Sequence, residues 1–266
     1  MAASSVGWST VQGVLGADMQ TVSYDRPGLG WSPRRPATES TSLLAITDRL
    51  RSLVMALALP RPFVLVAHSF GAYIATVYAH RFPQDIVGIV LVDPITPAEW
   101  MHPRAKEEWR RRRAVWLSHT ARGVAAVGLI RLGLWGLLRR GHGNPGPVLG
   151  LSETLRRIAA EVGKLPSASA RALRARWNEP SFFRTMAESI GALPQCAADA
   201  SAQPIPAGMP VTILSSGDHS PDQIAEHAAI ATQHVIVAGS THFIHFGQPE
   251  VVCAAIRDLA AATWRR

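Results

Sequence analysis

The chain has 266 residues, of which 47% are hydrophobic and 17% are charged, so it is long and apolar enough to form one sizeable core. Its two cysteines, Cys196 and Cys253, exclude a disulfide scaffold and a thiolate metal cluster, and we expect both to be inert, buried thiols. The formal net charge is +8, but only Lys106 and Lys164 of the 27 basic residues are lysines, and no nucleic-acid-binding signature accompanies the arginines. Composition therefore predicts a folded protein that does not bind nucleic acid.

The N-terminal residues show no basic region followed by an apolar run, so the sequence predicts no signal peptide and a cytoplasmic location. The most membrane-like stretch, 114–138, is interrupted by Arg122 and Arg131, so no transmembrane segment is predicted. Arginines are concentrated in this part of the chain, beginning with a run at 110–113. A peripheral contact of this Arg-rich segment with a membrane surface therefore stays open. The sequence does not indicate the oligomeric state.

Strands and helices alternate along most of the chain. A short strand is expected at 21–24, followed by a Pro- and Gly-rich turn at 25–30, and Ser40 or Thr41 then caps a helix. Apolar runs predict further strands at 63–67, 86–92, 211–214 and 234–237, and helical spacing predicts helices at about 70–81 and 249–264. This order predicts an α/β fold with a mostly parallel, doubly wound sheet that helices cover on both faces.

The segment 97–207 differs from the rest of the chain. It is rich in Arg and Ala, shows helical spacing and contains no convincing strand. We therefore expect a helical cap that is inserted into a core made of residues 1–96 and 208–266 and that covers the active site of this core. Aromatic side chains in this insert are expected partly to line an apolar pocket and partly to hold the cap helices together.

Ser69 stands between a predicted buried strand and a predicted helix. Ala67, two residues before it, and Gly71, two residues after it, are small, as a tight strand-to-helix turn requires. Such a turn lifts the serine hydroxyl above the carboxyl edge of the sheet and directs the next backbone N–H, that of Phe70, to the same space. Ser69 is therefore the predicted nucleophile and Phe70 a predicted oxyanion donor, whereas the alternative is an ordinary serine at a helix N-cap.

A serine hydroxyl needs a base that takes its proton and a carboxylate that orients the base. His242 follows the last predicted strand and is preferred over His245 as the base. For the acid, Asp218 follows the 211–214 strand and is preferred over Asp93, which follows the 86–92 strand. Asp222 is a weaker third choice. Structural or surface roles are expected for the other histidines near these segments, His68, His80, His219, His227 and His234.

Three motifs together resemble the α/β-hydrolase fold family, in its esterase and haloperoxidase-like branch: YDRPGLGWS at 24–32, the turn at Ser69, and THFI at 241–244 with QPE at 248–250. The resemblance covers about 1–97 and 208–266. It implies a serine hydrolase that needs neither a metal nor an organic cofactor. The motifs are not specific for a substrate, and a small apolar ester or acyl substrate is our own expectation. The serine argues against the dehalogenases and epoxide hydrolases of this family, which use aspartate at that position.

The N-terminal part departs from the family pattern. Family members place a strand that ends in His-Gly, or a variant of it, several residues before a tryptophan equivalent to Trp8, and the loop after that strand supplies a second oxyanion N–H. In this chain the loop would fall at 1–3, so Met1 is the expected second donor and the strands before it are absent. We therefore expect an N-terminally incomplete core and a poorly soluble or weakly active chain. Ester hydrolysis, acyl transfer and ligand binding by a truncated, catalytically weak or inactive member all stay open.

Overall fold

The structure is a computed structural model that describes residues 4–36, 38–127 and 159–264. The chain divides into two compact units. The first, here called the sheet unit, comprises Ala37–Trp109 and Gly191–Arg266. The second, here called the helical unit, comprises Ala2–Pro36 and Arg110–Ile190.

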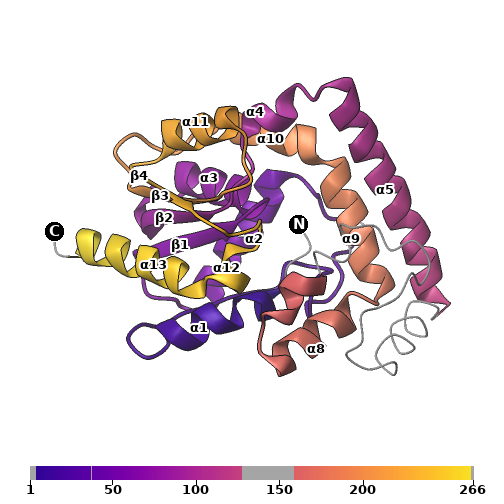
Figure 1. Cartoon of the computed structure of the whole chain (residues 1–266), viewed down its shortest axis with the longest axis horizontal. Helices are drawn as coiled ribbons and strands as arrows, with labels where there is room; N and C mark the ends of the chain where they lie inside the picture. The colour runs from indigo at the N-terminus through magenta and orange to yellow at the C-terminus, as the bar shows by residue number, and fades with distance from the viewer. Residues whose placement is uncertain (1–3, 37, 128–158, 265–266) are drawn as a thin grey trace. The chain divides into compact units, whose positions relative to one another are not determined.

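A parallel sheet forms the centre of the sheet unit (Figure 1). Within the described residues it has four strands, which lie side by side in sequence order: β1 (Phe63–His68), β2 (Ile86–Val92), β3 (Val211–Ser216) and β4 (Gln233–Val237). Strand β3 is buried along its whole length and β2 along most of it, as expected for strands with helices on both faces. The predicted α/β class and these four predicted strands are confirmed, and their carboxyl ends meet at one edge of the sheet.

Helices cover both faces of this sheet (Figure 1). The helices of the sheet unit are α2 (Leu43–Ala56), α3 (Gly71–Arg81), α4 (Pro97–Met101), α10 (Leu193–Ser201), α11 (Pro221–Ile230), α12 (Ile244–Gly247) and α13 (Pro249–Trp264), with a short 3₁₀ turn, η2 (Pro83–Asp85). Of these, α3, α11 and α13 pack directly against the strands. Because α3 and α11 each join successive parallel strands, the right-handed crossover rule puts both on the same face, and α13 packs on the opposite face. A Cβ at Gly88 of β2 would lie 2.8 Å from Leu259 Cδ2, so glycine permits this close approach of α13.

Local sequence explains where α2 begins. Its N-cap is Ser42, whose hydroxyl oxygen accepts the Ala45 N–H at 3.2 Å. The predicted caps, Ser40 and Thr41, are therefore one or two residues too early. The Ser40 hydroxyl accepts the N–H of Ser42 at 3.1 Å and so supports the cap instead of forming it.

The helical unit combines the N-terminal residues with later helices. Its elements are η1 (Ser5–Trp8), α1 (Ser9–Leu15), α8 (Ser167–Arg176), nearly all of α9 (Pro180–Gly191) and most of α5 (Ala105–Ala126). The Ser9 hydroxyl donates to the Ser169 hydroxyl at 2.9 Å, and the Thr185 hydroxyl donates to the Gly28 carbonyl at 3.3 Å. The expected strand at 21–24 is wrong, because these described residues have no strand geometry, and the Ser23 hydroxyl donates to the Gln12 side chain of α1 at 2.7 Å.

The two units divide the chain differently from the predicted core and cap. Residues 2–36 group with the helical segment, whereas α4 and α10 group with the sheet. The boundaries of the two units near 110 and 190 do not coincide with the expected cap boundaries at 97 and 207, and the division into core and cap stays a prediction. Part of the expected cap, 128–158, lies outside the described residues. That the cap covers Ser69 stays a prediction.

The described helices include none that is long and apolar enough to cross a membrane. Helix α5 exposes Trp109 and Trp116 on its surface, with fractional exposures of 59% and 64%. Arg112 and Arg113 are also exposed on this helix. Aromatic and basic side chains together suit the surface of an anionic membrane, so the peripheral contact expected from the sequence stays a prediction.

A buried aspartate links three elements of the sheet unit. Asp85 in η2 is fully buried, and its carboxylate accepts hydrogen bonds from Arg51 at 3.0 Å, Arg61 at 3.1 Å and Tyr78 at 3.1 Å. Burial by itself would raise the pKa of Asp85, but these three donors outweigh it and lower the pKa below its usual value. The carboxylate is therefore ionised and paired in the folded protein.

Replacing this carboxylate should measurably destabilise the sheet unit. We expect Asp85→Asn to lower the free energy of unfolding by roughly 2–3 kcal/mol, somewhat less than for a fully buried pair because Arg51 and Arg61 stay 32% and 39% exposed. Because folding lowers the pKa of Asp85, the difference from wild type should be complete above the unfolded pKa and shrink as the pH falls below it. Urea unfolding at several pH values measures this, with Asp48→Asn as the control.

Asp48 is a suitable control because its ion pair with Arg81, at 2.6 Å, lies on the surface, where Asp48 is 52% exposed. We expect Asp48→Asn to change the free energy of unfolding by less than about 1 kcal/mol. Equal effects of the two substitutions would contradict the structural role given to Asp85.

Candidate active site

Ser69 lies at the turn from β1 into α3. Its φ angle is +54°, in the left-handed region, which costs an L-residue roughly 1–2 kcal/mol and is found mostly at functional sites. The turn is tight, because a Cβ at Gly71 would lie 3.3 Å from the Cβ of Ala67. The Ser69 N–H donates to the Val92 carbonyl at 3.1 Å and so ties the turn to the end of β2. The small residues that the sequence shows around Ser69 are thus explained by the geometry.

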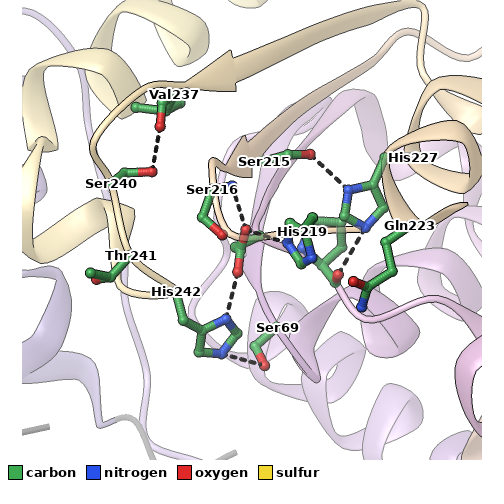
Figure 2. Close-up of polar contacts among 12 residues, drawn as sticks. Ser69, Ser215, Ser216, His219, Gln223, His227, Val237, Ser240, Thr241 and His242 are labelled. Atoms are coloured by element: carbon green, nitrogen blue, oxygen red, sulfur yellow. Dashed lines mark hydrogen bonds and ion pairs between the residues drawn. The ribbon is translucent and has the colours of Figure 1, made fainter. Parts of the chain in front are cut away.

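His242 lies directly beside the Ser69 hydroxyl (Figure 2). Its Nε2 is 3.0 Å from Ser69 Oγ, and its Nδ1 is 2.6 Å from Asp93 Oδ2. An ionised carboxylate can only accept hydrogen bonds, so Nδ1 carries the proton and Nε2 of the neutral ring is left to accept the proton of Ser69. The three side chains therefore form a continuous line of hydrogen bonds from a hydroxyl to a carboxylate.

Asp93 is almost fully buried at the end of β2, and its φ angle is +46°. Its Oδ1 accepts the Ser216 N–H at 2.6 Å and lies 2.8 Å from Nε2 of His219. Burial alone would raise the pKa of Asp93, but the hydrogen bonds from His219, His242 and Ser216 hold it far below its usual value. The carboxylate is ionised at any ordinary pH and can stabilise a positive charge on His242.

The preference for Asp218 as the partner of His242 is wrong. Asp218 is exposed in the turn after β3, and Asp222 is exposed in the first turn of α11. The end of β3 contributes two hydrogen-bond donors to this site instead of a carboxylate: the Ser216 N–H and the His219 side chain. Strand order agrees with this choice, because β2 pairs directly with β1, the strand that carries Ser69, and β3 does not. This order is a tertiary feature that no local pattern of the sequence shows.

The predicted oxyanion donors can be located only in part. Phe70 is buried and lies between Ser69 and the first residue of α3, so its N–H belongs to the N-terminal turn of that helix. Helix N-termini favour negative charge, which suits the developing oxyanion. Met1 lies outside the described residues, so its expected contribution stays a prediction.

Two further histidines surround His242. The His68 ring donates through Nε2 to the main-chain carbonyl of His242 at 2.7 Å, and burial followed by the nearby His245 and His242 lowers the pKa of His68. His245, the competing base, is fully buried in α12, and burial together with His242 lowers its pKa to about 3. The structure therefore places His242 rather than His245 against Ser69, and His68 anchors the loop that carries His242.

A second hydrogen-bonded chain lies next to this site (Figure 2). His227 Nε2 is 3.1 Å from the Pro94 carbonyl, Ser215 Oγ is 2.7 Å from His227 Nδ1, and His234 Nε2 is 2.8 Å from Ser215 Oγ. Because the carbonyl only accepts, His227 donates through Nε2, Ser215 donates to His227, and His234 donates to Ser215. Burial lowers the pKa values of both histidines, which keeps this chain neutral.

The arrangement can remove a proton from a hydroxyl and return it. As Ser69 attacks an electrophilic carbon, His242 can take its proton, and Asp93 can stabilise the imidazolium that results. Among the described side chains, no group of three His, Cys, Asp or Glu residues is placed to hold a metal ion. Cys196 and Cys253 are buried and form no disulfide, as predicted.

Comparison with known proteins gives a family match along nearly the whole chain. The model of the family described as "Alpha/beta hydrolase family" matches residues 2–255. Among curated proteins, the chain is 32% identical over 91 residues to the uncharacterised protein YqjL of Bacillus subtilis, a match that covers 34% of this chain and 35% of that protein. It is 34% identical over 83 residues to an uncharacterised protein of Schizosaccharomyces pombe, C23C11.06c, covering 31% of this chain and 15% of that protein. The matches thus span only a minor part of these relatives.

Solved structures share the fold along almost the full chain. A thermophilic esterase from Thermogutta terrifontis is 19% identical with a TM-score of 0.59, covering 98% of this chain and 86% of its own. A haloalkane dehalogenase variant from Bradyrhizobium elkanii is 20% identical with a TM-score of 0.61, covering 99% and 88%. An epoxide hydrolase from Bacillus megaterium is 14% identical with a TM-score of 0.65, covering 97% and 90%. Identities this low show the fold alone.

Proposed function

Because this chain belongs to the alpha/beta hydrolase family, we propose that it is a serine hydrolase that cleaves a carboxylic ester or a related acyl bond. The observation that carries the proposal is the line from Ser69 through His242 to Asp93, with distances of 3.0 Å and 2.6 Å. Within a family that also contains dehalogenases and epoxide hydrolases, a serine at the turn favours acyl chemistry, because those enzymes use an aspartate there.

In the first half-reaction, Ser69 Oγ attacks the carbonyl carbon of the ester, and its proton passes to Nε2 of His242. The carbonyl oxygen becomes an oxyanion, to which the Phe70 N–H donates. The tetrahedral intermediate then collapses, the bond to the alcohol oxygen breaks, and His242 returns the proton to the leaving alcohol. The product of this step is an acyl ester on Ser69.

In the second half-reaction, water attacks the acyl carbon and gives a proton to His242, which passes it back to Ser69 Oγ as the carboxylic acid leaves. Replacing water by an alcohol in this step gives acyl transfer with the same residues. The ionised Asp93 stabilises the His242 imidazolium in both halves, and His68 holds the main chain of His242 in place. The proposed chemistry uses these side chains and requires no cofactor.

The proposal is tested with a short-chain aryl ester, such as p-nitrophenyl acetate, and with a fluorophosphonate that reacts with activated serines. We expect release of the phenol and a single covalent adduct on the protein. A small apolar acyl group is the proposed substrate class. A folded chain that neither turns over the ester nor reacts with the fluorophosphonate would contradict the proposal, and would leave ligand binding by an inactive member of the family as the alternative.

A further inference from the structure

The carboxylate of Asp93 is shared by two imidazoles. His242 Nδ1 lies 2.6 Å from one oxygen, and His219 Nε2 lies 2.8 Å from the other, which also accepts the Ser216 N–H (Figure 2). The His219 side chain is 15% exposed, against 44% for His242. The catalytic role proposed for Ser69, His242 and Asp93 explains the position of His242 beside this carboxylate but not that of His219.

The backbone holds His219 firmly in this place. It lies in the short turn between β3 and α11, directly before the N-cap of α11. That N-cap is a capping box, in which the Ser220 hydroxyl accepts the Gln223 N–H and the Gln223 side chain accepts the Ser220 N–H. The segment that carries His219 is thus held at both ends. Before it, the Ser216 N–H at the end of β3 donates to Asp93, and after it the capping box fixes the start of α11.

The surroundings of His219 favour a positive charge on its ring. The hydrogen bond to Asp93 raises the pKa of His219 above its ordinary value, and burial only partly opposes this. The ionisable and polar groups that act on His219, or that it acts on, are Asp93 at the end of β2, Glu99 in α4, Gln223 and His227 in α11, and His234 in β4. The His227 ring lies edge-on to it, with centroids 5.0 Å apart, and stays neutral.

We propose that His219 is a positioning residue for the proposed hydrolase: it fixes the Asp93 carboxylate for His242, and on protonation it competes with His242 for that carboxylate. The proposal rests on the proposed function. With a neutral His219 ring, the N–H donor orients one carboxylate oxygen and leaves the other to accept the hydrogen bond from His242 Nδ1. With a cationic ring, the same carboxylate has to stabilise two imidazolium ions during each attack by Ser69.

This competition has a consequence for the pH dependence of the reaction. A reaction that depends on a general base slows on the acid side of its pH profile, where one proton occupies the base. Protonation of His219 adds a second loss, because it weakens the support that Asp93 gives to His242. Asp93 itself stays ionised throughout this range, because its pKa is far below the usual value. The acid side of the rate profile should therefore depend on two protons rather than one, unlike that of a site with a single histidine on its acid.

Two substitutions at His219 separate its two roles. His219→Gln keeps an N–H donor near the position of Nε2 but cannot take up a proton, and His219→Leu removes both the donor and the charge. His234→Gln is the matched control, since His234 donates to Ser215 and does not touch Asp93. The measurement is the second-order rate of fluorophosphonate labelling at Ser69 between about pH 5 and pH 9, which spans the histidine range.

We expect His219→Gln to keep the labelling rate on the pH-independent plateau within about threefold of wild type. On the acid side of the profile, here called the acid limb, the rate should depend on one proton instead of two. His219→Leu should lower the plateau by about 10-fold to 100-fold, because Asp93 is no longer held in place. His234→Gln should behave as wild type. An acid limb as steep in His219→Gln as in wild type would overturn the proposal, whether or not His219→Leu folds, and so would an unchanged plateau in a folded His219→Leu.

The failure of this proposal can be told apart from the failure of the proposed function. A wild-type chain that never labels at Ser69 overturns the proposed function, and with it the role of His219 in the reaction. Labelling at Ser69 with an unchanged acid limb in His219→Gln overturns only the role of His219. An NMR titration adds a readout without chemistry: Asp93→Asn should lower the pKa of the His219 ring, and a ring that titrates alike in both proteins would contradict the pairing.

Discussion

Replacing Ser69 by alanine is expected to abolish ester turnover while the protein stays folded. Without the Oγ atom no acyl-enzyme can form. Removal of the nucleophile from a catalytic triad typically lowers kcat by at least about 10⁴-fold. The left-handed backbone at Ser69 does not depend on its hydroxyl, so the fold should persist. The measurement is kcat for p-nitrophenyl acetate, together with a thermal unfolding curve for each protein.

The control for this experiment is Ser240→Ala. Ser240 is another buried serine of the sheet unit, but its hydroxyl donates to the Val237 carbonyl at 2.7 Å and has no contact with His242. Its removal should leave kcat within a few-fold of wild type. Turnover by Ser69→Ala at the wild-type rate would mean that a different group attacks the ester, and the assignment of Ser69 would be wrong.

The second large effect is expected at the acid, where the chain offers two aspartates in similar sequence settings. Asp93→Asn should lower kcat by about 10³–10⁴-fold, because an amide neither stabilises the His242 imidazolium nor selects the correct tautomer of the ring. Asp218→Asn should change kcat by less than about twofold, since Asp218 is exposed and His242 donates its Nδ1 hydrogen bond to Asp93.

Both substitutions preserve shape and change one charge, so the comparison isolates the position of the carboxylate. The kcat of each variant should be measured on the pH-independent plateau of the wild-type rate profile. A large loss in Asp218→Asn with a small loss in Asp93→Asn would contradict the geometry and restore the acid that the sequence favoured.

The sequence predicted the strands of the sheet from their apolar residues. The clearest signals are the long, mainly apolar runs of β1 and β2, which are typical of strands with helices on both faces. The four residues at 21–24 have high strand propensity but no such run, and Val22 is 51% exposed. Their packing depends on residues outside the segment, as the hydrogen bond from the Ser23 hydroxyl to the Gln12 side chain illustrates, and the pattern at 21–24 does not encode such contacts.

The site shows the same division between local and tertiary information. Ser69 could be located because its turn requires small residues two positions before and after it, a steric demand that is written in the sequence. The acid could not be chosen in this way, because Asp93 and Asp218 both follow a strand. The choice depends on which strand pairs with β1 and on the donors that reach the carboxylate, both of which are tertiary features. His219 was missed for the same reason.

The most direct test of the central claim, that His242 and Asp93 activate Ser69, is peptide mapping by mass spectrometry after brief exposure to the fluorophosphonate. Wild type and Asp218→Asn should carry one adduct on the peptide that contains Ser69, and the fluoride of the reagent should be lost. Asp93→Asn should carry almost none in the same time. An adduct on another residue, or equal labelling of Ser69 in all three proteins, would contradict the claim.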